Sequence, residues 1–394
     1  MMKKVVLAFS GGLDTSFCVK YLQKEKGMEV HTAIVNTGGF STSELEAIAH
    51  QAKRLGASSH VTLDKTQEFY QKAIRYLIFG NVLRNHTYPL SVSAERMFQA
   101  VAVAEYAQKI GADAVAHGST GAGNDQVRFD LVFQTLAPQL EIITPIRDLK
   151  LSREQEIEYL KKQGVEANWE KAKYSINKGL WGTSVGGAET LTSDRYLPED
   201  AFPSQLQRTD SQKISLFFEK GEPCALNDLR KNPIELIQEL QAIASQYAIG
   251  RDIHVGDTII GIKGRVGFEA AAPMIILKAH QTLEKHTLTK WQLYWKDQLA
   301  QWYGMMLHEG LYLDPVMRNI EAFLESSQAR VTGKVEVALY PYRFVVLGIQ
   351  SDYDLMNPAF GSYGEMNRSW TGEDAKGFTK ILSNYLKIFY SIKK

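Results

Sequence analysis

Short apolar runs alternate with longer amphipathic stretches along roughly the first 165 residues of the chain. The apolar runs are rich in β-branched residues and predict strands at 5–9, 30–35, 60–63, 114–117 and 141–144. The stretches between them place apolar residues at helical spacing and predict helices at 15–26, 43–55, 65–79 and 94–110. Such alternation favours right-handed crossovers, so we predict an α/β fold with a Rossmann-like, doubly wound parallel sheet.

The pattern changes after a predicted helix that begins at the capping box Ser152-Arg153-Glu154-Gln155 and ends near Gly164. Residues 174–211 are rich in Gly, Ser, Thr, Asp and Pro, which predicts a long ordered loop. Strand-like runs at 213–218, 335–339 and 344–347 then flank a predicted long helix at about 280–310, which indicates a second domain of α+β type. The last segment, about 373–391, predicts an amphipathic helix. We therefore expect domains at 1–165 and 166–370, followed by a helical segment at 371–394.

Composition narrows the class of protein. The 394 residues carry a formal net charge of +1, which argues against nucleic acid or an anionic membrane as the main partner. The two cysteines, Cys18 and Cys224, are too few for a disulfide framework or a thiolate zinc site within the chain. No apolar run approaches the roughly 18 residues of a membrane span, and the run after Lys4 is too short for a signal peptide. These features predict a cytoplasmic globular protein.

The loop after the first predicted strand reads Ser10-Gly11-Gly12-Leu13-Asp14-Thr15-Ser16 and leads into a helix. It lacks the lysine with which the usual phosphate-binding loop reaches the terminal phosphates of ATP. Backbone amides, hydroxyls and a helix N-terminus can nevertheless hold a pyrophosphate group. The loop therefore favours cleavage of ATP between its α and β phosphates, and its S-G-G-x-D-[S/T] pattern resembles the ATP pyrophosphatase superfamily. The alternative is a glycine-rich turn with a purely structural role.

A second loop, residues 117–129, follows another predicted strand and holds Asn124, Asp125 and Arg128. Together these side chains can read an amino acid. Arg128 can bind a carboxylate, Asp125 an ammonium group, and Asn124 either one.

These two loops, together with residues 174–184 (Tyr174-Ser175-Ile176-Asn177-Lys178-Gly179-Leu180-Trp181-Gly182-Thr183-Ser184), resemble the signature motifs of argininosuccinate synthase. The resemblance extends over essentially the whole chain. It implies an adenine nucleotide alpha hydrolase-like domain, a synthetase domain, and a homotetramer in which the C-terminal helix reaches a neighbour. It also implies an AMP-forming ligase of arginine biosynthesis that uses ATP with Mg²⁺, citrulline and aspartate, through a citrullyl-adenylate.

The resemblance carries over to individual positions. It implies ATP binding, with Val35 at the adenine side, by Ala8, Phe9, Ser10, Gly11, Gly12, Leu13, Asp14, Thr15, Ser16, Val35 and Gly118. It implies aspartate binding by Thr120, Asn124 and Asp125. It implies citrulline binding by Tyr88, Ser93, Asn124, Arg128, Ser175 and Ser184. No protein ligand of a metal is implied.

The chain departs from the family at four positions. Asn177 and Gly179 stand where the family has an aspartate and an asparagine. Gly256 and Phe268 align with the glutamate and the tyrosine that face the amino-acid end of citrulline. The carboxylate expected to face the α-ammonium group is then missing. Asp257 or Glu269 could replace it, or the substrate could be an N-acylated citrulline.

Several residues have competing interpretations. His117 could assist catalysis, but a histidine that closes a strand is more often structural. Cys18 is expected in the core. Trp291, Trp295 and Trp302 share a helical face, which favours core or subunit packing over a nucleic-acid platform, because such a platform needs a basic surface.

Two other functions remain open from the sequence. A tRNA-modifying enzyme would share the first loop, but the basic surface and paired cysteines typical of that class are missing. A non-catalytic nucleotide-binding module would leave the second and third motifs unexplained.

Overall fold

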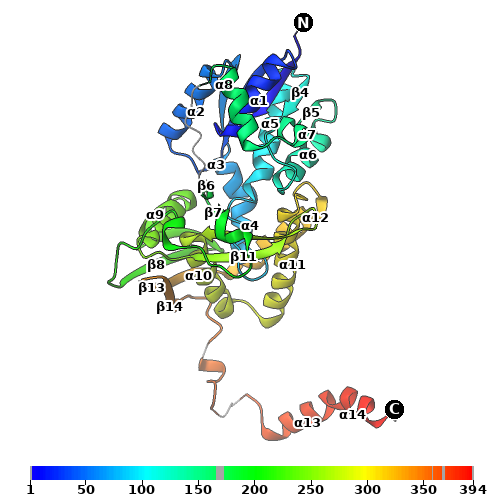
Figure 1. Cartoon of the computed structure of the whole chain (residues 1–394). Helices are drawn as coiled ribbons and strands as arrows, with labels where there is room; N and C mark the ends of the chain where they lie inside the picture. The colour runs from blue at the N-terminus through cyan, green and yellow to red at the C-terminus, as the bar shows by residue number, and fades with distance from the viewer. Residues whose placement is uncertain (1, 166–172, 357, 366–368, 393–394) are drawn as a thin grey trace.

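The computed structural model describes residues 2–165, 173–356, 358–365 and 369–392 (Figure 1). Five parallel strands form the first sheet, in the order β3-β2-β1-β4-β5. Their bounds are Lys4–Ala8 for β1, Glu29–Asn36 for β2, Ser59–Asp64 for β3, Ala114–Ala116 for β4 and Glu141–Ile143 for β5. This confirms the predicted α/β class and all five predicted strands, whose ends shift by no more than one residue.

Helices cover both faces of this sheet. Val5, Leu7 and Ile34 pack in one hydrophobic cluster with α1, α2 and α8, whereas Val6 and Val35 pack in another with α5 and α6. The alternation of neighbouring strand residues between the two clusters is expected for a sheet buried on both sides. The helices are α1 Leu13–Lys24, α2 Thr42–Arg54, α3 Thr66–Phe69, the π-helix η1 Tyr70–Ile74, α4 Arg75–Phe79, α5 Glu95–Lys109, α6 Asp125–Leu136, α7 Pro145–Leu149 and α8 Arg153–Lys162.

The strand order reverses direction between β1 and β4. From β1 the chain builds outward through β2 and β3 on one side, and β4 and β5 extend the sheet on the other side. In open parallel sheets the crevice at such a switch point, beyond the carboxyl ends of the strands, is where ligands bind. The two loops singled out from the sequence follow β1 and β4, so the topology places them side by side at that crevice.

The second sheet is antiparallel, in the order β10-β9-β8-β13-β14, and packs against helices α9 and α10. The long helix predicted at 280–310 is wrong as a single element, because Leu288 is extended and Thr289 starts a new helix with a capping box. The elements are β8 Gln212–Glu219, β9 Glu222–Leu226, β10 Leu229–Arg230, α9 Pro233–Ser245, α10 Ala271–Thr287, α11 Lys290–His308, α12 Pro315–Ser327, η4 Gln328–Arg330, β13 Gly333–Tyr340 and β14 Arg343–Gln350.

A third sheet of four antiparallel strands, in the order β11-β12-β7-β6, lies between the other two (Figure 1). The long loop predicted at 174–211 is wrong in its first part, where a hairpin forms β6 and β7. Its Gly- and Ser-rich strands lack the apolar alternation of a half-buried sheet, since β6 buries none of its residues. The elements are β6 Ser175–Gly179, β7 Gly182–Gly186, η2 Ala188–Leu191, η3 Glu199–Ala201, β11 Arg251–Asp257 and β12 Lys263–Glu269.

The C-terminal segment extends away from the rest of the chain (Figure 1). It contains η5 Pro358–Phe360 and two consecutive helices, α13 Gly372–Leu382 and α14 Asn384–Ser391, neither of which buries a residue. Across the described ranges, no helix is both long and apolar enough to cross a membrane. The domain boundary predicted after residue 165 touches residues 166–172, which lie outside the described residues, so the division stays a prediction.

Candidate active site

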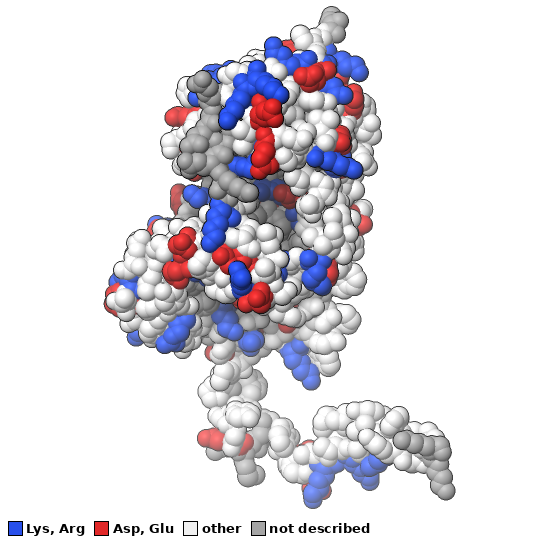
Figure 2. Space-filling view, in the orientation of Figure 1, with Lys and Arg blue, Asp and Glu red and all other residues white. Residues whose placement is uncertain are grey.

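A cavity of about 1190 Å³ lies between the carboxyl ends of β1 and β4 and one face of the third sheet. The loop after β1 lines it at one end, and α5, α6 and the third sheet line it at the other. The surface around it carries acidic and basic side chains intermixed on the face seen in Figure 2. The cavity therefore brings together segments as far apart in the sequence as Ala8 and His308.

The loop after β1 is shaped by hydrogen bonds between residues close together in the sequence. The hydroxyl groups of Ser10 and Thr15 lie 3.3 Å apart, the Gly12 N–H donates to Ser10 Oγ at 3.4 Å, and the Thr15 hydroxyl donates to the Gly12 carbonyl at 3.3 Å. Gly11 has a φ of +77°, a conformation that glycine adopts without strain. Helix α1 follows directly, so its N-terminal N–H groups and two hydroxyls meet at one end of the cavity.

The loop after β4 approaches this first loop closely at Gly118. A Cβ added to Gly118 would lie 3.2 Å from Thr15 Cγ2 and 3.4 Å from Asp14, so only glycine fits there without displacement. Of the positions assigned to ATP by resemblance, those that line the cavity are Ala8, Phe9, Ser10, Gly12, Leu13, Asp14, Thr15, Val35 and Gly118. Gly11 and Ser16 do not line it, because the amide of Gln51 donates to the Gly11 carbonyl at 2.8 Å and to the buried Ser16 hydroxyl at 2.9 Å.

Behind the loop, Asp14 is hydrogen-bonded to Glu156, a buried residue of α8. Burial, followed by the negative charge of Asp14, raises the pKa of Glu156 to about 8. Burial also raises the pKa of Asp14, although Glu156 and Arg153 act against that rise. The two carboxyl groups therefore hold a shared proton near neutral pH, as is expected when two acids meet in a desolvated place.

His117, at the end of β4, has both ring nitrogens engaged. Its Nδ1 accepts the Ser119 N–H at 3.2 Å, so the ring donates from Nε2 to Asp130 at 2.9 Å. Asp130 in turn accepts from Arg147 at 2.6 Å. His117 borders the cavity, but these bonds make it a brace for the loop after β4, which agrees with the structural interpretation favoured from the sequence.

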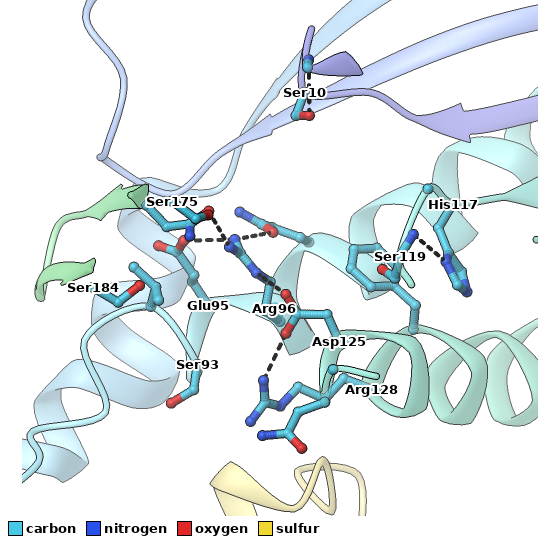
Figure 3. A pocket seen from close by; sticks show the side chains of 18 of the residues that line it. Ser10, Ser93, Glu95, Arg96, His117, Ser119, Asp125, Arg128, Ser175 and Ser184 are labelled. Atoms are coloured by element: carbon cyan, nitrogen blue, oxygen red, sulfur yellow. Dashed lines mark hydrogen bonds and ion pairs between the residues drawn. The ribbon is translucent and has the colours of Figure 1, made fainter. Parts of the chain in front are cut away.

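At the other end of the cavity, Asp125 lies between two arginines (Figure 3). Arg96 Nε donates to one of its oxygens at 3.0 Å, and Arg128 Nη1 donates to the other at 2.8 Å. Burial alone would raise the pKa of Asp125, but the two guanidinium groups lower it below its ordinary value. Thr120 and Asn124 line the cavity beside it, and Asn124 Oδ1 accepts the Ile259 N–H at 2.8 Å. The structure thus brings all three positions assigned to aspartate together.

All six positions assigned to citrulline line the same cavity, namely Tyr88, Ser93, Asn124, Arg128, Ser175 and Ser184. Arg128 is anchored by two further bonds, which it donates to the His308 carbonyl at 3.1 and 2.8 Å. Ser175 and Ser184 come from the hairpin β6–β7, where they project toward the helix that carries Arg96 (Figure 3).

Glu95 and Arg96, which line the cavity and lie between its labelled serines and Asp125 in Figure 3, were not predicted from the sequence. Glu95 accepts from the Thr37 hydroxyl at 2.9 Å and from Arg96 at 3.0 Å. Burial raises the pKa of Glu95 to about 7, and the charge of Arg96 opposes the rise. Their one distinguishing feature in the sequence is a charged pair at the start of an otherwise alanine-rich helix, which is equally typical of a solvated helix end.

The four departures from the family pattern fall in two places. Asn177 lines the cavity and accepts from Arg96 at 3.5 Å, and a Cβ added to Gly179 would lie 2.7 Å from Glu95 Oε2. Gly256 also lines the cavity. Phe268 lies outside the lining, because its buried ring packs against Tyr88 with 5.4 Å between the ring centroids.

Two structural expectations have different outcomes. Cys18 is fully buried, as predicted. The prediction of core packing for Trp291, Trp295 and Trp302 is wrong, since their exposed fractions are 64%, 56% and 58%. Packing of these tryptophans against another subunit stays a prediction.

Comparison with known proteins agrees with this geometry. Residues 4–166 match the model of the arginosuccinate synthase N-terminal HUP domain, and residues 174–389 match that of the arginosuccinate synthase C-terminal domain. The chain belongs to the argininosuccinate synthase family. It is 38% identical to the argininosuccinate synthase of Dictyoglomus thermophilum, over 99% of this chain and 98% of that protein.

Similar relatives occur in both archaea and bacteria. The argininosuccinate synthase of Methanocaldococcus jannaschii is 38% identical, over 93% of each chain. That of Xanthomonas campestris is 35% identical, over 100% of this chain and 99% of the relative. The relatives therefore match the chain across both of the regions that the two family models cover.

Proposed function

We propose that the chain joins citrulline to aspartate at the expense of ATP, releasing AMP and pyrophosphate, in the biosynthesis of arginine. The observation that supports this most is that one cavity contains both the pyrophosphate-type loop and the arginine-rich amino-acid end. In the first step the ureido oxygen of citrulline attacks the α-phosphorus of ATP and pyrophosphate leaves. In the second, the amino group of aspartate attacks the ureido carbon and AMP leaves.

In this proposal the protein contributes positioning and electrostatics. The helix α1 N-terminus and the hydroxyls of Ser10 and Thr15 bind the departing pyrophosphate, which lowers the barrier of the first step. Arg128 binds the carboxylate of citrulline, and Thr120, Asn124 and Asp125 orient aspartate. No covalent intermediate with a protein side chain is needed, because the substrate oxygen and nitrogen are the nucleophiles.

We also propose that Mg²⁺ accompanies ATP. Within the described residues there is no group of three or more His, Cys, Asp or Glu side chains arranged to hold a metal ion. Phosphate oxygens and water supply most ligands of Mg²⁺ in nucleotide sites. The donors fit that mode, because Asp14 is the one carboxylate in the loop and it is already paired with Glu156.

The experiment that tests the function follows the ureido oxygen. Citrulline labelled with oxygen-18 in its ureido group, incubated with the enzyme, ATP, Mg²⁺ and aspartate, should transfer the label to AMP. Pyrophosphate release should require citrulline, and argininosuccinate should require aspartate as well. Unlabelled AMP, or pyrophosphate release that depends on tRNA, would contradict the proposal.

We further propose a cytoplasmic homotetramer in which α13 and α14 pack on a neighbouring subunit. The two helices expose a row of large apolar side chains, Phe378, Ile381, Leu382, Tyr385, Leu386, Ile388, Phe389 and Tyr390. In Figure 2 most atoms of this segment are uncharged. An apolar surface of this extent normally marks a contact with another protein.

The assembly can be tested in the full-length chain. The double variant Ile381→Ser with Phe389→Ser should dissociate into smaller species, which light scattering coupled to gel filtration would detect. Replacement of two charged residues of the same helices, Lys376→Ser with Lys387→Ser, should leave the mass unchanged. A wild-type chain that runs as a monomer would contradict the proposed tetramer.

A further inference from the structure

The wall of the cavity that faces Arg128 is built from one face of the third sheet. His254 and Gly256 of β11 pair with Val266 and Gly264 of β12, so all four residues lie on that face, and all four line the cavity. The face offers an imidazole, a valine and two glycines. An amino acid bound with its carboxylate on Arg128 would turn its α-nitrogen toward residues of this kind.

Neither carboxylate next to this wall is available to receive an ammonium group. Asp257 borders the cavity, but its side chain is 62% exposed and pairs with Lys263 at 2.6 Å. Glu269 is buried away from the cavity, where it pairs with Arg251 at 3.0 Å and accepts the Ser204 hydroxyl. Asp257 and Glu269, the two carboxylates considered from the sequence as partners for the α-ammonium group, are therefore already engaged in ion pairs.

The nearest acidic groups deeper in the site are balanced as well. Asp125 is shared by two arginines, and Glu95 is paired with Arg96. Glu309, at the C-terminal end of α11, pairs with Arg84 at 3.4 Å.

The side chains that this face of the sheet presents to the cavity carry no charge at pH 7. Arg265 pairs with Val255 on the opposite face of the sheet and donates there to the backbone carbonyls of Glu189 and Arg195, at 3.3 and 2.9 Å. Burial and the charge of Arg84 lower the pKa of His254 to about 4, so its ring is neutral at pH 7. A desolvated ammonium group without an anionic partner is costly, whereas an amide nitrogen carries no charge to desolvate.

The cross-strand pair of glycines also leaves room. A Cβ added to Gly264 would meet nothing closer than Thr258 Cγ2 at 3.7 Å. A Cβ added to Gly256 would lie 2.5 Å from His254 Nε2, so the imidazole occupies the space that a longer side chain at 256 would need. The His254 ring is stacked on Tyr88 at a centroid distance of 5.2 Å, which fixes its position.

We propose that this end of the cavity binds a citrulline whose α-nitrogen is acylated, an inference that rests on the ligase function proposed above. In this proposal the acyl group lies along Gly256 and Gly264. The ring of His254, which is stacked on Tyr88 and forms no hydrogen bond within the described residues, accepts the amide N–H.

The test compares three substrates under identical conditions with ATP, Mg²⁺ and aspartate, namely citrulline, N-acetylcitrulline and N-succinylcitrulline. We expect kcat/KM for one acylated substrate to exceed that for citrulline by at least about tenfold, the scale of discrimination that one buried group provides. A preference for either acylated substrate over citrulline supports the inference, and the ratio between the two acylated substrates reports how large an acyl group this wall accepts. If kcat/KM for citrulline equals or exceeds that for both acylated substrates, this inference alone is overturned. If no AMP forms with any of the three substrates, the proposed ligase function is overturned as well.

A matched pair of variants tests the wall itself. Gly264→Glu places a carboxylate on the wall where a side chain fits, and Gly264→Gln places a neutral group of the same size there. Relative to the glutamine variant, the glutamate variant should shift the ratio of kcat/KM toward citrulline by about tenfold. An identical substrate ratio in the two variants would show that the charge of this wall does not select the substrate.

Discussion

The two ends of the cavity are built in different ways. The nucleotide end consists largely of one contiguous loop, residues 9–15, whose groups are backbone amides and hydroxyls. The amino-acid end consists of side chains from α5, α6, the hairpin β6–β7 and the strands β11 and β12. A contiguous loop depends on local backbone conformation, whereas the assembled end depends on charge balance among groups that only the fold brings together.

The largest effect should come from breaking the nucleotide end at the contact between its two loops. Gly118→Val would push the loop after β4 away from Thr15 and Asp14, since even a Cβ there lies 3.2 Å from Thr15. We expect kcat/KM for ATP to fall by about a thousandfold, equally for every amino-acid substrate. Steady-state kinetics of pyrophosphate release would measure this.

The matched control for that variant is Gly121→Val. Gly121 lies in the same loop but outside the lining of the cavity, and an added Cβ there meets only Arg147 at an ordinary 3.6 Å. It should retain most activity. Equal losses in both variants would mean that the loop as a whole, and not the contact at Gly118, determines ATP binding.

A smaller and more selective effect is expected at the assembled end. Asp125→Asn removes the charge shared by Arg96 and Arg128. We expect kcat/KM for the amino-acid substrates to fall by about a hundredfold while KM for ATP changes little. The free energy of unfolding should fall by about 1–2 kcal/mol, because the carboxylate is 39% exposed and water screens part of the loss.

Urea denaturation and steady-state kinetics would check both values for Asp125→Asn. The control variant is Asp257→Asn, which breaks an exposed pair with Lys263 at the rim and should leave stability nearly unchanged. If the KM for ATP rises in parallel with the KM values for the amino acids, the two ends of the cavity do not act separately.

The smallest expected effect concerns the pH dependence of stability. It tests whether the nucleotide end depends only on its own loop or also on Glu156, a residue of α8 that is distant in the sequence. Glu156 has a pKa raised to about 8 in the folded state, so the folded protein binds more protons than the unfolded chain between pH 4.5 and 8. Stability should therefore fall as pH rises through that window, by on the order of 2 kcal/mol. In Glu156→Gln this part of the pH dependence should disappear.

Thermal or urea unfolding of wild type and Glu156→Gln at pH 5, 6, 7 and 8 would test this. The control is Glu158→Gln on the same helix, where the exposed carboxylate pairs with Lys162 and should not alter the slope. Parallel stability curves for wild type and Glu156→Gln would show that Glu156 does not retain a proton behind the loop.

The sequence predicted most of the first 165 residues because the relevant signals are local. Apolar runs such as 5–9 and 30–35 are buried on both sides of the sheet, so hydrophobicity alone marks them. The capping box at Ser152 likewise formed as predicted. The hairpin β6–β7 escaped prediction, because its strands serve the cavity and lack the alternation of a half-buried sheet. The break between α10 and α11 at Thr289 was not predicted, because apolar residues continue at helical spacing on both sides of the capping box.

What the sequence by itself determined is the identity of the pyrophosphate-type loop and of the groups that could read an amino acid, since both lie within short motifs. What only the tertiary structure decided is which charges face one another. Arg96 and Glu95 became part of the site because α5 crosses the crevice, and His254 fills the space beside Gly256 because β11 folds over Tyr88. Electrostatic balance depends on distances of a few ångströms between residues far apart in the chain, and no local pattern encodes those distances.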